Sequence, residues 1–107
     1  MQCEVITAGE WRVVKLGGDI DMHASPAARA TILQCIRENH PVVVDLSAVS
    51  YIDSSGIASL VEGLQAARAK RLEFGLFGAS VAAMRVLKLA RLETVFKFYP
   101  ALPFANA

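Results

Sequence analysis

Residues 42–61 read Val42-Val-Val-Asp-Leu-Ser-Ala-Val-Ser-Tyr-Ile-Asp-Ser-Ser-Gly-Ile-Ala-Ser-Leu-Val61, and they carry the clearest indication of the fold class. It begins with a β-branched run without polar alternation, which is typical of a strand covered on both faces in an α/β sheet. We expect this strand to end at Asp45-Leu46. After a turn, apolar residues recur from Ile57 to Leu64 at the i, i+3, i+4, i+7 spacing of an amphipathic helix. A buried strand that leads into such a helix predicts an α/β domain.

Two β-prone runs, 3–7 and 11–16, open the chain. They are separated by Ala8-Gly9-Glu10, and a three-residue connection that contains glycine is typical of a β-hairpin. We expect Gly17-Gly18 to end the second strand and to free the chain for a turn.

A first helix is predicted between this hairpin and the central strand. Ser25 is a suitable N-cap, and Pro26 would occupy the first helical position, where its missing N–H costs nothing. The helix should end near Asn39, because Pro41 disfavours helical backbone in the residue before it. The expected inward stripe comprises Ala28, Ile32, Cys35 and Ile36.

The last third of the chain predicts three further elements. Residues 74–77 are expected to form a strand, and Ser80 can cap a third helix. Residues 95–99 would form a short final strand. The inward residues of the third helix are expected to be Val81, Met84 and Leu87. The predicted order is ββαβαβα(β), which indicates an α/β fold with helices packed on a sheet.

Composition excludes several classes of function. The chain has 107 residues, 54% of them hydrophobic, which is enough for one domain spanning 1–107. Eleven Lys and Arg against 10 Asp and Glu give a net charge of +1, so we expect no nucleic-acid binding. Cys3 and Cys35 lack metal-ligand spacing and are expected to be buried, reduced thiols. No apolar run approaches the ~20 residues of a membrane helix and no secretory signal is evident, so we expect a cytoplasmic protein without membrane insertion.

The turn Asp53-Ser54-Ser55-Gly56 is the most informative polar segment. Asp53 is a natural N-cap, which places both serines and Gly56 in the first turn of the helix. Free backbone N–H groups and the helix dipole favour an anion there, so a serine hydroxyl at this place can carry a phosphoryl group. Gly56 would leave the backbone bare for the active site of another protein. Capping alone is the simpler interpretation of the same residues.

The segment Ile52-Asp53-Ser54-Ser55-Gly56-Ile57, preceded by Val43-Val44-Asp45-Leu46-Ser47, resembles the signature of STAS domains. Within that family it most resembles bacterial anti-sigma factor antagonists. Gly18-Asp19-Ile20-Asp21 is similar to the family's segment before the first helix, and residues 80–96 are similar to its third helix and hydrophobic tail. The resemblance covers nearly the whole chain. It implies a STAS-type fold with a mixed sheet of four to five strands.

The resemblance also implies a switch and its partners. The second serine of the motif is the family's phosphoacceptor, which is Ser55 here. The implied partner is a serine kinase that is also an anti-sigma factor, with a histidine-kinase-like ATPase fold, and a serine phosphatase would reset Ser55. The unmodified domain would bind this kinase and free a sigma factor, whereas the phosphorylated domain would not. The implied contact surface comprises Asp21, Asp53, Ser54, Ser55, Gly56, Ser59 and Glu62, the last two pointing outward from the helix.

Family members commonly end in a further amphipathic helix, whereas residues 101–107 form a short, Pro-interrupted tail. The apolar composition also resembles the STAS subunits of lipid-trafficking ABC transporters. A structural subunit that binds a transport ATPase is therefore the alternative function. Neither function needs a metal, a cofactor or catalysis by this chain, and we expect a monomer.

An enzymatic function would require a serine nucleophile at the Asp53 turn and a histidine base. The Gly-x-Ser-x-Gly motif is absent, and so is a P-loop. His40 is expected at the opposite pole from the turn, and His23 has no evident orienting partner.

The third helix also carries a basic stripe, which we interpret as a solvated face; electrostatic contact with a partner is the alternative. The stripe comprises Arg85, Lys88, Arg91 and, beyond the helix, Lys97.

Overall fold

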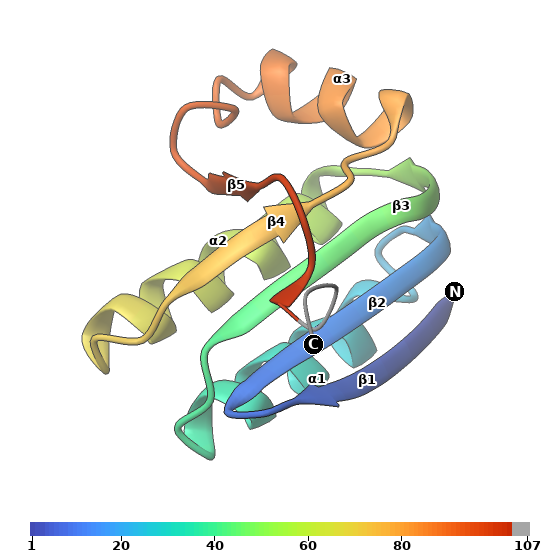
Figure 1. The fold of residues 1–107 in the computed structure, drawn as a ribbon. Helices are drawn as coiled ribbons and strands as arrows, with labels where there is room; N and C mark the ends of the chain where they lie inside the picture. The colour runs from blue at the N-terminus through green and yellow to red at the C-terminus, as the bar shows by residue number, and fades with distance from the viewer. Residues whose placement is uncertain (104–107) are drawn as a thin grey trace.

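The computed structural model describes residues 1–103, which form a five-stranded sheet and three helices (Figure 1). The elements follow the order ββαβαβαβ, so the predicted α/β fold is confirmed, including the short final strand. Their bounds are β1 Gln2–Ala8, β2 Trp11–Ile20, α1 Ser25–Arg37, β3 Val42–Ile52, α2 Ser54–Ala69, β4 Phe74–Phe77, α3 Val81–Leu89 and β5 Lys97–Tyr99.

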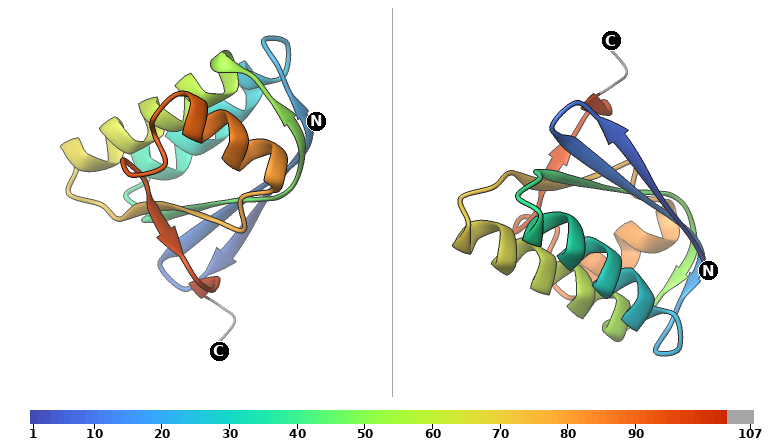
Figure 2. Two further views of the ribbon diagram at one scale, coloured as in Figure 1. Left: turned by 90° about the horizontal axis from the view of Figure 1, so that it is seen from above. Right: turned by 90° about the horizontal axis from the view of Figure 1, so that it is seen from below.

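The sheet has the strand order β1-β2-β3-β4-β5. β1 pairs antiparallel with β2 through a two-residue turn, one residue shorter than predicted, and the other neighbours are parallel. Helices connect the parallel strands, as parallel pairing requires. In Figure 2 all three helices lie on one side of the sheet, and their inward side chains share one hydrophobic core with the strands. β1 forms one edge of the sheet, and Cys3 on it is exposed, which corrects the prediction of a buried thiol.

Both central strands run further than the sequence predicted. β2 continues through Gly17-Gly18 to its end at Ile20, with shifts in its register against β3 on either side of this pair. β3 continues past Leu46 because Asp45 holds an irregular segment within the strand. Its Oδ1 accepts hydrogen bonds from the backbone N–H of Ser47 at 2.9 Å and from Ser47 Oγ at 2.7 Å. Asp45 therefore stabilises the middle of β3, and the strand ends at Ile52, directly before Asp53.

α1 lacks the predicted Ser25 cap. Ser25 is buried within the first turn, and the N-cap residue Ala24 contributes no side-chain hydrogen bond. Asp21 takes this role from the preceding loop, because its Oδ1 accepts hydrogen bonds from the backbone N–H groups of His23 and Ala24, both at 3.0 Å. The predicted inward stripe is confirmed as buried, and it comprises Ala28, Ile32, Cys35 and Ile36.

The face of the sheet opposite the helices carries the last described residues, 99–103, which we call the strap. In Figure 1 the strap crosses in front of β4 and β3 toward the hairpin. It is therefore the strap, and not a helix, that lies on the second face of the central strand. No α-helix forms in residues 101–103, and the remainder of the Pro-interrupted tail, 104–107, lies outside the described residues.

Tyr99 anchors the strap. A Cβ added to Gly75 would collide with the Tyr99 ring, so the absence of a side chain there lets the ring lie against the sheet. The ring also makes an edge-to-face contact with Trp11, with centroids 5.6 Å apart. The Tyr99 hydroxyl donates a hydrogen bond to Glu73 at 2.8 Å. Burial, followed by this bond to a carboxylate, raises the pKa of Tyr99 above its usual range.

α3 is rotated about its axis relative to the prediction. Ser80 caps it as predicted, because its Oγ accepts a hydrogen bond from the backbone N–H of Ala83 at 3.2 Å. Ala83 and Leu87 face the core, whereas Val81 is 78% exposed and Met84 is half-buried, so two of the three expected inward residues are wrong. The helix has apolar residues on every side, and spacing alone therefore cannot select the side that is buried.

Candidate functional site

The Asp53 turn lies where β3 ends and α2 begins. Asp53 is the N-cap of α2, and its Oδ1 accepts hydrogen bonds from the backbone N–H groups of Ser55 at 2.9 Å and Gly56 at 3.3 Å. Ser55 Oγ donates to the same oxygen at 2.5 Å. This hydroxyl bond, together with the backbone N–H groups of Gly56, Ser55 and Met22, lowers the pKa of Asp53. Capping by Asp53 is thus confirmed, and it leaves the carboxylate charged at neutral pH.

The two serines of the turn differ in what they contact. Ser54 is the first residue of α2 and is exposed. Ser55 is half-buried, with its hydroxyl held against the Asp53 carboxylate. Ser55 therefore combines partial access with a fixed orientation at the positive end of the helix dipole, where a phosphoryl group is electrostatically tolerated.

The loop that contains Asp21 lies beside this turn. The backbone N–H of Asp53 donates to the carbonyl of Ile20 at 3.3 Å, which joins the end of β2 to the start of α2. The structure therefore brings Asp21 and Asp53 to the same end of the sheet. Met22, at the tip of this loop, is 67% exposed. Met22 was not among the residues predicted for this surface, although an apolar residue between two polar ones in a short loop is a usable signal for a contact surface.

Gly56 was predicted to offer bare backbone to a partner, and this prediction is wrong. It is buried, and a Cβ built on it would lie 2.6 Å from Ile52 Cγ1 and 2.9 Å from the carbonyl oxygen of Ile20. Glycine is needed here because α2 packs closely against β2 and β3. A large side chain at this position would disrupt the fold before it could test any interface.

Ser59 does not point outward, so its predicted orientation is wrong. It is 4% exposed, and its Oγ lies 3.1 Å from the carbonyl oxygen of Ser55 and 3.3 Å from that of Ser25. Ser59 therefore stabilises the contact between α1 and α2. Glu62 is partly exposed, but its carboxylate pairs with Arg29 of α1, a partner that the sequence did not indicate. We define the Asp53 face as Asp21, Met22, Asp53, Ser54 and Ser55.

The histidines do not assemble a catalytic site with the serines. His40 precedes β3 and its Nδ1 lies 3.1 Å from the carbonyl oxygen of Glu10, whereas Asp53 follows the other end of the same strand. An 11-residue strand separates these ends by roughly 30 Å. His23 is exposed in the Asp21 loop, and no side-chain hydrogen bond orients its ring among the described residues.

Within residues 1–103, no group of three or more His, Cys, Asp or Glu side chains is arranged to hold a metal ion. No helix in this range is both long enough and apolar enough to cross a membrane.

The basic stripe of α3 shares no residue with the Asp53 face. Its two helical members, Arg85 and Lys88, are exposed and flank apolar side chains.

Comparison with known proteins points to one family. A family model of the STAS domain matches residues 2–105. An anti-sigma-B factor antagonist of Staphylococcus epidermidis is 29% identical over 94 residues, which cover 87% of each chain. The crystal structure of an anti-sigma factor antagonist from Mycobacterium paratuberculosis is also 29% identical, with a TM-score of 0.79, and the match covers 94% of this chain and 86% of that one.

A third similarity concerns the fold alone. The Bacillus cell fate determinant SpoIIAA in its phosphorylated form has a TM-score of 0.73 and 20% identity, and the match covers 92% of each chain. This similarity supports the fold of the present chain.

Proposed function

The chain belongs to the STAS domain family, and from this premise we propose that it is an anti-sigma factor antagonist whose binding is switched by phosphorylation of Ser55. One observation carries the proposal: a partly accessible Ser55 hydroxyl is held by Asp53 at the N-terminus of α2. The names of the curated relatives support the class of function. The partner is a serine kinase that is also an anti-sigma factor, and the contact centres on the Asp53 face.

The proposed modification forms a bond between Ser55 Oγ and the γ-phosphorus of ATP supplied by the kinase. The bond from that phosphorus to the leaving ADP breaks, and the hydroxyl proton passes to a base of the kinase. Asp53 is a poor base because its pKa is lowered, so its role is to orient Ser55 Oγ. The chain itself contributes an acceptor, and the kinase contributes ATP, Mg²⁺ and the base.

Phosphorylation changes the Asp53 face in two ways. It removes the proton that Ser55 Oγ donates to Asp53, and it adds about 1.5 to 2 negative charges beside that carboxylate. Asp21 adds a further carboxylate at the same end of the sheet. A partner that binds the neutral hydroxyl would then face an unpaired charge, which typically costs several kcal/mol when it is buried in an interface. The kinase would therefore release the modified domain.

The test compares the wild type with four variants, each expressed at native level in its own cells. Phosphate mapping by mass spectrometry should place the modification on Ser55 in the wild type and find none in Ser55→Ala, with Ser54→Ala modified as in the wild type. Affinity capture should retain a histidine-kinase-like ATPase with the wild type and lose it with Ser55→Asp. Thr94→Asp adds the same charge in an exposed turn and should capture the ATPase normally.

Two outcomes would refute the switch. Phosphate on Ser54 or Ser80 in place of Ser55 would contradict the assigned acceptor. Equal capture by the wild type, Ser55→Ala and Ser55→Asp would show that binding ignores this site. Capture of a permease together with its transport ATPase would favour the alternative function as a transporter subunit.

A further inference from the structure

The outer side of α3 is apolar where a surface helix is usually polar. Val81 is 78% exposed and Leu89 is 79% exposed, and Met84 between them is half-buried. Two exposed cations, Arg85 and Lys88, stand among these apolar side chains. Within the described residues the ion pairs are Arg29–Glu62 and Lys97–Glu73, so neither cation of α3 has an acidic partner.

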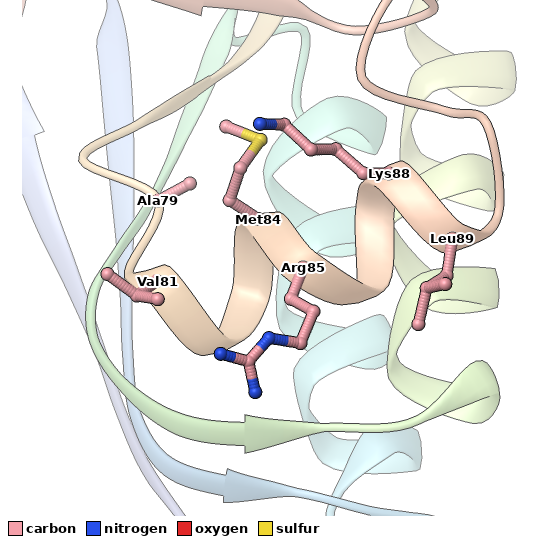
Figure 3. A pocket seen from close by; sticks show the side chains of 6 residues that line it. All are labelled: Ala79, Val81, Met84, Arg85, Lys88 and Leu89. Carbon is pink, nitrogen blue, oxygen red and sulfur yellow. The ribbon is translucent and has the colours of Figure 1, made fainter.

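These side chains line a groove of about 610 Å³. In Figure 3, Met84 and Lys88 extend to one side of the helix, and Arg85 and Leu89 extend to the other. Each side therefore presents a cation next to an apolar side chain. The lining residues, which we call the α3 groove, are Ala79, Val81, Met84, Arg85, Lys88 and Leu89.

The open shape of the α3 groove suits a macromolecule better than a small ligand. All of its lining residues belong to one helix and the segment just before it, so the groove has no second wall. Ligand pockets bury most of their ligand between several elements. An occupant here must bring its own apolar surface, and that requirement indicates a macromolecule.

We propose that the α3 groove is a docking surface for a segment of a partner protein that is apolar on one side and acidic beside it. Apolar residues of the segment would cover Val81, Met84 and Leu89, and its carboxylates would pair with Arg85 and Lys88. This surface is separate from the Asp53 face and does not depend on the state of Ser55. A helix laid into the groove is the fitting geometry, because α3 offers about 13 Å of helix length.

The arrangement of charge argues against two other occupants of the α3 groove, an anionic membrane and a second copy of this chain. A helix that lies on an anionic membrane has cations along the border of an apolar face, whereas here cations and apolar side chains alternate. A second copy of this chain, docked through a two-fold axis on the same surface, would bring a second Arg85 and Lys88 pair into the contact and no added carboxylate from the groove. A second copy therefore leaves the cations without acidic partners, whereas an acidic protein segment supplies them and also covers the apolar side chains between them.

The test uses a designed helical peptide of about four turns, with leucines along one side and glutamates beside them. Titration into the ¹⁵N-labelled protein, followed by NMR, should give saturable shifts confined to residues 79–90. Arg85→Glu/Lys88→Glu should weaken binding at least about tenfold, because attraction becomes repulsion. A peptide with lysines in place of the glutamates should bind this variant and not the wild type. Ser55→Asp should bind the acidic peptide as the wild type does.

Lys15→Glu/Arg37→Glu is the matched control, because it changes net charge equally at exposed positions away from the groove. Equal weakening by this control would mean that only net charge matters and would overturn the proposal. Shifts outside residues 79–90 would do the same. Binding of vesicles that contain phosphatidylglycerol, blocked by the α3 variant, would assign the groove to a membrane. Self-association lost in that variant, measured by sedimentation velocity, would assign it to a second copy.

Discussion

Two leucines in α3, two residues apart, should differ strongly in how much stability the protein loses when each is replaced by alanine. Leu87 is fully buried in the core, and Leu89 is 79% exposed. Leu87→Ala removes buried apolar atoms and leaves a cavity, which costs about 2–5 kcal/mol. Leu89→Ala removes atoms that are already in water, so its effect should stay within about 0.5 kcal/mol. The two variants should therefore differ by at least about 1.5 kcal/mol in free energy of unfolding.

The assay is urea unfolding followed by far-UV circular dichroism, with the slope checked for a common two-state transition. In thermal scans each kcal/mol corresponds to about 4–8 °C for a domain of this size, so the Tm values should differ by at least about 6 °C. Equal losses of stability, or a larger loss in Leu89→Ala, would show that the assigned rotation of α3 is wrong. The α3 groove would then lose its physical basis.

Three further perturbations test the site and the strap. Gly56→Arg should abolish the folded circular dichroism spectrum, because the arginine side chain would collide with the Ile20 carbonyl. Ser54→Arg in the same turn should stay folded. A folded Gly56→Arg variant would contradict the packing. Asp53→Asn keeps a capping side chain but loses the charge, so it should be less stable than the wild type at pH 7 in urea unfolding. Because the folded pKa of Asp53 is lowered, that difference is fully present above the ordinary pKa of about 4 and should shrink as pH falls from there through the lowered pKa. A difference that does not change with pH would refute the role of the charge. Absorbance near 295 nm should show that Tyr99 ionises only above the usual pKa of tyrosine, and the free energy of unfolding should fall as pH rises beyond about 10. Titration of Tyr99 at the usual pKa of tyrosine would mean that the strap does not pack against the sheet.

The parts of the fold that the sequence predicted correctly depend on local patterns. The β-branched start of β3 and the Asp53 cap lie within a few residues of the features that identify them. The parts that were wrong depend on distant neighbours. Gly56 packs against the carbonyl of Ile20 from another strand, and Ser59 contacts the carbonyl of Ser25 from another helix. No local pattern carries that information.

The extended strands show a second limit. Paired glycines, and an aspartate with a serine two residues later, usually mark the end of a strand. Here Gly17-Gly18 and Asp45 are tolerated because β2 and β3 lie side by side and keep pairing beyond each irregularity. The prediction that Asp53 caps α2 was correct, and the predicted exposure of Gly56 and Ser59 was wrong because packing buries both residues.

The strand order also bears on how the chain acquires its fold during synthesis. Because β1 to β5 stand in the sheet in the order in which the ribosome makes them, each new strand adds to an edge that already exists. No strand has to insert between two neighbours that have already paired, and domains generally begin to fold from the N-terminal side as they emerge. Until the strap arrives, the second face of the nascent sheet stays uncovered. That face is then the surface most in need of a chaperone, and the strap is the segment that removes the need.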